Sequence, residues 1–168
     1  QAHYETTGPE ILADFPSVQA VVGSLGSGGT MHGTARFLKA HRDSIKIFTV
    51  EAASDTKIPG VGAFNDGDYK TPFILDLLQN QLADERYEVT LEQAQTRTRD
   101  LARQGFFCGV QTGAVVESAI RAAREHGHWR SPFCVLKGCI LGGRRPPLPT
   151  GNRPARAMAR VVGPARRD

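Results

Sequence analysis

One stretch decides the fold: Val21-Val22-Gly23-Ser24-Leu25-Gly26-Ser27-Gly28-Gly29-Thr30-Met31-His32-Gly33. A short apolar run ends in a glycine-dense turn, and a helix-like segment follows over residues 30–40. Glycine lets the backbone turn tightly and approach a ligand, because no Cβ stands in the way. The first amides of a helix have no intrahelical partner, and the helix dipole favours negative charge there. A strand, a glycine turn and a helix start in this order predict a phosphate-binding cradle.

The two commonest nucleotide patterns do not fit this loop. Counted from Gly26, the dinucleotide pattern Gly-x-Gly-x-x-Gly requires glycine where Met31 stands, and the P-loop requires lysine where Gly29 stands. Glu51 follows the next apolar run and could act as the acid that binds a ribose in dinucleotide folds. A dinucleotide-binding domain that uses Glu51, and a non-catalytic α/β module that binds a phosphorylated ligand, therefore remain alternatives.

The predicted elements alternate between strand and helix. Compact β-branched or apolar runs predict strands at 18–22, 46–50, 86–89 and 133–136. Helices are expected over 7–15, 30–41, 90–104 and 111–126, with capping boxes at Thr7/Glu10 and Thr90/Gln93, and residues 52–71 are expected to form a loop. This alternation indicates an α/β fold with a three-layer, Rossmann-like parallel sheet.

Composition excludes several classes of protein. The chain has 168 residues, and no apolar run approaches the roughly 18 residues of a membrane span. Its start, Gln1-Ala2-His3, does not resemble a signal peptide. None of the three cysteines lies in a Cys-x-x-Cys pair, which indicates cytosolic thiols rather than disulfides or a zinc site. We therefore expect a cytoplasmic protein with no membrane partner and no metal.

The C-terminal tail differs sharply from the rest of the chain. From Gly138 onward it contains seven arginines and one acid, a charge of +6, so residues 1–137 carry −2 of the net +4. Five prolines also lie there. We predict a partial cofactor-binding domain at 1–137 and an Arg/Pro-rich tail at 138–168 that is disordered or non-family sequence. Nucleic-acid binding is not expected, because the tail lacks interleaved aromatic residues.

Four ordered motifs together carry a family resemblance: His3-Tyr4-Glu5-Thr6-Thr7-Gly8-Pro9-Glu10-Ile11, then Gly26-Ser27-Gly28-Gly29-Thr30, then Ile58-Pro59-Gly60-Val61-Gly62-Ala63, and then Gly105-Phe106-Phe107-Cys108-Gly109-Val110-Gln111-Thr112-Gly113-Ala114. In this order they resemble the pyridoxal-phosphate enzymes of fold type II, and in particular the cysteine synthase and cystathionine β-synthase family. The match runs from His3 to about Leu136 and resembles the C-terminal part of a family member.

The resemblance implies a cofactor, a reaction and a set of site residues. The cofactor would be pyridoxal 5′-phosphate, with its phosphate bound by Gly26, Ser27, Gly28, Gly29 and Thr30. The loop Gly60, Val61, Gly62 and Ala63 would flank cofactor and substrate. The cofactor would act as an electron sink for β-elimination from an activated serine, after which sulfide or a thiol adds to an aminoacrylate intermediate. The resemblance also implies a small amino-acid substrate and a homodimer.

Besides the tail at 138–168, in which no residue can be assigned the family's contact with the pyridine nitrogen, one departure from the family pattern limits these expectations. The family's Schiff-base lysine lies upstream of the glycine loop, whereas all five lysines here follow it: Lys39, Lys46, Lys57, Lys70 and Lys137. We therefore expect a fragment that is inactive alone, and we assign no catalytic residue. Gln111 and Thr112 stand where the family has a serine pair, and they either shape the cofactor pocket or cap the following helix. Asp84, Glu85 and Glu88 are interpreted as surface charges.

Overall fold

The computed structural model describes residues 1–126 and the backbone of residues 133–136. Within these residues a parallel sheet has the strand order β3-β2-β1-β4. The strands are β1 (Ala20–Ser24), β2 (Lys46–Ala52), β3 (Glu85–Val89) and β4 (Phe133–Leu136). The helices are α1 (Ala2–Glu5), α2 (Thr7–Asp14), α3 (Gly29–His41), α4 (Pro72–Gln79), α5 (Leu91–Arg103) and α6 (Val110–Glu125), with a 3₁₀ turn η1 (Phe64–Asp66).

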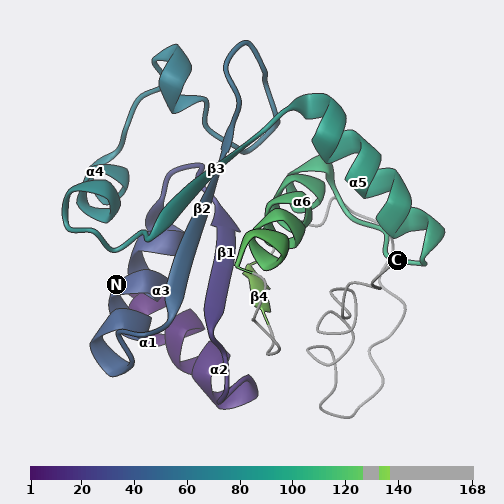
Figure 1. Cartoon of the computed structure of the whole chain (residues 1–168). Coiled ribbons are helices and arrows are strands. Elements are labelled where there is room, and N and C mark those ends of the chain that lie inside the picture. Colours follow the sequence, from purple (N-terminus) through teal and green to yellow (C-terminus); the bar gives the residue numbers. More distant parts are fainter. Residues whose placement is uncertain (127–132, 137–168) are drawn as a thin grey trace.

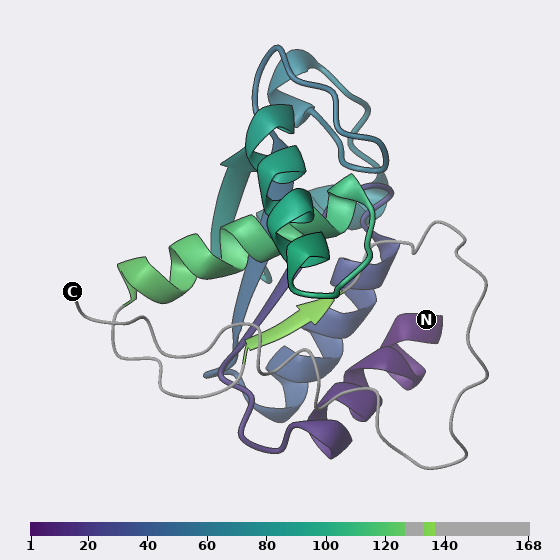
Figure 2. The ribbon, with the colours of Figure 1, turned by 90° about the vertical axis from the view of Figure 1, so that its right-hand side faces the viewer.

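The sheet lies between two helical layers. Helices α5 and α6 lie on one side of it and α1, α2, α3 and α4 on the other (Figures 1 and 2). Side chains alternate between the two cores along each central strand, so Val22 and Phe48 pack towards α6, whereas Val21 and Ile47 pack towards α3. Both faces of β1 and β2 are buried, as expected for a parallel sheet covered on both sides. The predicted α/β fold with a three-layer parallel sheet is confirmed.

Most predicted elements are present, with small differences at their ends. Strand β1 begins two residues later than expected and β2 extends two residues further. The capping box at Thr90 is confirmed, because its side chain and that of Gln93 each bond the other's backbone amide. The capping box predicted at Thr7 is wrong. The N-cap residue of α2 is Thr6, and its side chain makes no hydrogen bond to the helix amides, because the Thr6 hydroxyl donates to the Ala2 carbonyl instead.

Helix α4 is the main element that the sequence analysis did not predict. Thr71 caps it, with its hydroxyl accepting from the Ile74 amide, and Pro72 occupies the first helical position. A Thr-Pro pair before an apolar run is a recognised helix start, so a signal was present. The helix buries Ile74 and Leu77 in the core shared with α3. It therefore stands directly beside the glycine loop.

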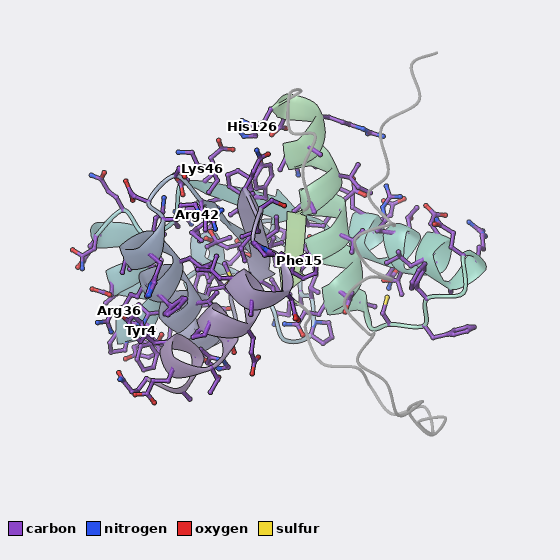
Figure 3. All side chains as sticks on the ribbon, turned by 90° about the horizontal axis from the view of Figure 1, so that it is seen from below. Tyr4, Phe15, Arg36, Arg42, Lys46 and His126 are labelled. Atoms are coloured by element: carbon purple, nitrogen blue, oxygen red, sulfur yellow. The ribbon has the colours of Figure 1, made fainter. Side chains whose placement is uncertain are left out.

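Two glycines allow the N-terminal helices to pack closely on α3. A Cβ on Gly8 would lie 2.6 Å from the Phe37 ring, and one on Gly33 would lie 2.9 Å from the Cβ of His3. The Phe37 ring makes an edge contact with Tyr4, with centroids 5.5 Å apart. The Arg36 guanidinium lies 5.5 Å from the centre of the Tyr4 ring, and the two side chains are seen together in Figure 3. The first of the four sequence motifs is thus packed against α3, the helix that follows the second motif.

One predicted surface charge is in fact part of a half-buried ion-pair cluster. Asp84 has a side chain only 16% exposed and accepts from Lys39 and Lys46, both at 2.8 Å. It also accepts from the Ile47 amide at 2.8 Å. Burial opposes ionisation, but these three donors outweigh it and hold the pKa of Asp84 below its ordinary value. The carboxylate ties α3 and β2 to the start of β3.

Candidate functional site

The glycine loop (residues 23–30) occupies the carboxyl end of the central strand β1. Gly28 adopts a φ of +83°, a left-handed conformation that favours glycine, and α3 begins at the next residue. The first amides of α3 have no acceptor inside the helix, and Ser27 and Thr30 are exposed beside them. This edge of a parallel α/β sheet, at the carboxyl ends of its strands, is where such folds bind ligands.

Neighbouring segments close one side of the glycine loop. A Cβ on Gly26 would lie 3.0 Å from the Gly60 carbonyl oxygen, and one on Gly28 would lie 2.6 Å from Cγ1 of Ile74. The Ser27 carbonyl accepts from the Thr71 hydroxyl at 2.6 Å, so the N-cap residue of α4 also holds the loop. At Gly29 a Cβ would meet nothing closer than 3.8 Å. The loop is therefore packed from behind and open at Gly29, where a ligand could approach.

The first and second motifs meet through a histidine. His3 Nε2 lies 3.1 Å from the Thr30 hydroxyl, and His3 Nδ1 lies 3.0 Å from the Thr7 hydroxyl. An Nε2–H on His3 would donate to Thr30 and leave the threonine proton for an anion. Sequence patterns offered no local signal for this contact, because it joins residues 27 positions apart.

The predicted substrate loop lies beside the glycine loop, as a segment we call the 58–63 loop. The Gly62 amide donates to the Leu25 carbonyl at 2.7 Å, and the Gly62 carbonyl accepts from the Ala52 amide at 2.9 Å. Gly60 has a φ of +80°, and Val61 and Ala63 are buried. The structure thus brings Gly60, Val61, Gly62 and Ala63 next to Gly26, Ser27, Gly28, Gly29 and Thr30.

The fourth motif reaches the same place through Gln111. Its Nε2 donates to the Ser24 hydroxyl at 2.9 Å and to the Gly60 carbonyl at 3.0 Å. The N-cap of α6 is Gly109, with no side-chain cap hydrogen bond, so Gln111 does not cap that helix. Its neighbour Thr112 is fully buried. Of the two open interpretations, the contacts of Gln111 favour the shaping of the site.

Glu51 is not available to a ribose. Its side chain is 1% exposed, and both carboxylate oxygens accept from Arg86, at 2.7 and 2.8 Å. Hydrogen bonding to this carboxylate, only partly opposed by burial, raises the pKa of Arg86 above its ordinary value. The pairing leaves the dinucleotide-binding alternative without its key acceptor.

Three of the lysines within the described residues make polar contacts with other side chains or with a backbone carbonyl. Lys39 and Lys46 pair with Asp84, and Lys70 donates to the Phe64 carbonyl at 3.3 Å. Lys57 is exposed, and Lys137 and the predicted tail at 138–168 lie outside the described residues. Residues 1–126 and 133–136 hold no cluster of His, Cys, Asp or Glu suited to a metal ion. Nor does this part of the chain include a helix long and apolar enough to cross a membrane.

Comparison with known proteins gives a consistent result. The family described as "Pyridoxal-phosphate dependent enzyme" matches residues 1–138. Cysteine synthase B of Escherichia coli (strain K12) is 32% identical over 127 residues, which cover 74% of this chain and 40% of that protein. Cysteine synthase of Staphylococcus aureus is 28% identical over 144 residues, covering 81% and 46%. This chain therefore spans less than half the length of these relatives.

A solved structure agrees with the sequence matches. The crystal structure of a hydrogen sulfide-producing enzyme from Fusobacterium nucleatum superposes with a TM-score of 0.73 at 30% identity. The superposition covers 83% of this chain and 48% of that one. With the four motifs gathered at one edge of the sheet and the family match over most of its length, the chain belongs to the pyridoxal-phosphate-dependent enzyme family, among the relatives of cysteine synthase.

Proposed function

We propose that this chain forms part of the cofactor domain of a cysteine synthase-like enzyme, and that its glycine loop holds the phosphate of pyridoxal phosphate. One observation carries the proposal. The glycine loop starts helix α3, whose first amides have no acceptor inside the helix, the loop is open at Gly29, and the neighbouring Ser27 and Thr30 are exposed. Amides, hydroxyls and helix dipole all favour a phosphate dianion.

The residues present fit such a group. The glycine loop has no side chain at Gly26, Gly28 and Gly29, so a phosphate can approach the backbone closely. The 58–63 loop forms a neighbouring wall, pinned to Leu25 through Gly62. When bound, the cofactor supplies an electron sink for negative charge on the substrate's α-carbon. The chain's own contribution is to bind and orient the phosphate and to place the two loops side by side.

The substrate class follows from the same proposal. From the resemblance to cysteine synthases we propose an activated serine as substrate and sulfide or a thiol as the group transferred. The full enzyme would be a cytoplasmic homodimer. We also propose that this chain alone does not catalyse the reaction, because Lys39 and Lys46 pair with Asp84, Lys70 donates to the Phe64 carbonyl, and the family resemblance implies a Schiff-base lysine upstream of the glycine loop.

The phosphate-binding proposal can be tested with 4′-deoxypyridoxine phosphate, which keeps the ring and phosphate but has no aldehyde to react with lysines. Calorimetric titration of the chain should show binding of this analogue and none of 4′-deoxypyridoxine. Thr30→Val should weaken binding by about ten- to a hundredfold, since a hydrogen bond to a charged group contributes about 1.5–3 kcal/mol. Thr96→Val, at an exposed position on α5, is the matched control. Equal affinity for both compounds would contradict the proposal.

The absence of activity has its own test. Pyridoxal phosphate and borohydride should label the exposed lysines of the chain weakly and without selectivity. Stoichiometric labelling of a single lysine, with sulfide-dependent formation of cysteine from an activated serine, would show that the chain is active by itself.

A further inference from the structure

We propose that Gln111 is a positioning residue that holds the 58–63 loop against the glycine loop and so sets the spacing between two walls of the candidate cofactor site. The part of this inference that concerns cofactor affinity rests on the proposed function. The part that concerns the loop does not.

The chemistry of the side chain suits this role. A carboxamide carries two N–H donors on one nitrogen, and Nε2 of Gln111 uses them on two segments. One bond reaches the Ser24 hydroxyl at the end of β1, 2.9 Å away, and the other reaches the Gly60 carbonyl, 3.0 Å away. A serine at this position has one proton and could donate to only one of them. Gln111 therefore links α6, β1 and the 58–63 loop in a way that a serine cannot.

The Gly60 carbonyl is the group whose position Gln111 controls. Its oxygen lies 3.0 Å from where a Cβ on Gly26 would be, so it also packs against the glycine loop. The Gln111 carboxamide covers Gly60 on the other side, with Oε1 3.0 Å from where a Gly60 Cβ would be. Gly60 itself is exposed and has a left-handed φ, which glycine adopts without strain, so a contact such as that of Gln111 is needed to fix where its carbonyl points.

Among the described residues, the other hydrogen bonds of the 58–63 loop do not involve the Gly60 carbonyl. Gly62 is bonded to Leu25 and Ala52 through backbone groups alone. The Val61 amide donates to Ile58 within the loop, at 3.0 Å. Loss of the Gln111 bond would therefore leave Gly62 anchored and the Gly60 carbonyl held only by the turn between Ile58 and Val61, so the side of the loop that faces Gly26 would loosen.

The test compares variants of the full chain. Gln111→Glu keeps the shape of the side chain and removes both donors, and Gln111→Ser leaves one donor on a shorter side chain. Ser24→Ala removes one acceptor, and the exposed Gln104→Glu on the end of α5 is the control. Hydrogen exchange is followed at the hydrogen-bonded amides of Val61 and Gly62, with those of β2 as the reference for global opening.

We expect exchange of the Val61 amide, whose peptide group carries the Gly60 carbonyl, to rise about tenfold in Gln111→Glu and Gln111→Ser, while β2 amides and the circular dichroism spectrum stay unchanged. Ser24→Ala should give a smaller rise, and Gln104→Glu none. Unchanged loop exchange in both Gln111 variants would overturn the inference. An equal rise in loop and β2 exchange would also overturn it, because it would show a general packing role.

Affinity for 4′-deoxypyridoxine phosphate provides the second measurement. It should fall at least about threefold in Gln111→Glu, in parallel with loop exchange. If the unaltered chain does not bind the analogue, the proposed function fails, and loop exchange alone still decides whether Gln111 holds the loop. If binding persists unchanged while loop exchange rises, the loop is held by Gln111 but does not form a wall of the cofactor site.

Discussion

The carboxylate of Glu51 accepts two hydrogen bonds from the guanidinium of Arg86, with Nε at 2.7 Å and Nη2 at 2.8 Å. Glu51 is 1% exposed, whereas the Arg86 side chain is 40% exposed. The pair links the end of β2 to β3 on the face that α3 and α4 cover. A planar guanidinium matches a carboxylate in this two-bond geometry, which a lysine could not reproduce.

Removal of Arg86 alone should lower the free energy of unfolding more than removal of both charges of the pair. Arg86→Met leaves a buried carboxylate without its partner and should lower the free energy of unfolding by about 3 kcal/mol. The double variant Glu51→Gln/Arg86→Met should be more stable than Arg86→Met alone. Urea denaturation of the single and double variants measures this. A double variant no more stable than Arg86→Met would contradict the argument.

Alanine substitutions at two glycines with positive φ allow the cost of a left-handed backbone to be measured separately from the cost of steric overlap. In Gly28→Ala the new Cβ would lie 2.6 Å from the Ile74 side chain, whereas in Gly67→Ala it meets nothing within 4 Å. Both variants adopt an unfavourable left-handed conformation, which costs about 1–2 kcal/mol. Gly28→Ala should lose about 1–3 kcal/mol more through overpacking. Thermal unfolding of both variants checks the difference, and equal losses would show that Ile74 can move aside.

Asp84 should make stability depend on acid pH. Because the pKa of Asp84 is lowered in the folded state, its contribution is present above the unfolded pKa of about 4 and is lost as the pH falls through the lower folded pKa. Asp84→Asn should lose about 2 kcal/mol at neutral pH and show a shallower decline of stability below about pH 4. Denaturation at a series of pH values measures this, with the exposed Asp14→Asn as control. Parallel pH profiles for Asp84→Asn and the unaltered chain would refute it.

Thr34 should tolerate the loss of its hydroxyl. It is fully buried in α3, and among the described residues its Oγ1 has no hydrogen-bond partner. By contrast, the buried Ser118 donates back to the Ala114 carbonyl four residues earlier. Thr34→Val keeps the shape and removes an unpaired polar atom, so it should stabilise the chain by about 1 kcal/mol.

The matched control is Thr49→Val. Thr49 is equally buried, but its hydroxyl donates to the Glu85 carbonyl at 3.4 Å. That variant should be destabilised by about 1 kcal/mol, because it leaves the carbonyl with one partner fewer. Chemical denaturation of the two variants compares them directly. Destabilisation of Thr34→Val would mean that its hydroxyl has a partner in solution.

Local patterns predicted the elements well where the signal lies within a few residues. Thr90 and Gln93 stand three positions apart, and their capping box formed as expected. At Thr7 the same pattern failed, because only Thr6 separates α1 from α2, and this residue became the cap. Asp84 was expected at the surface, since nothing near it in the sequence shows that Lys39 on α3 packs beside it.

The sequence by itself determined the kind of protein: a glycine turn between strand and helix, three further motifs in order, and a parallel α/β sheet. These features rest on backbone conformation and on hydrophobic pattern, both of which are local. Only the tertiary structure decided which side chains meet at the site. Gln111 reaches Ser24 across 87 positions and Gly60 across 51, and His3 reaches Thr30 across 27. Such contacts depend on how helices and loops pack on the sheet, because strands distant in the sequence end at the same edge.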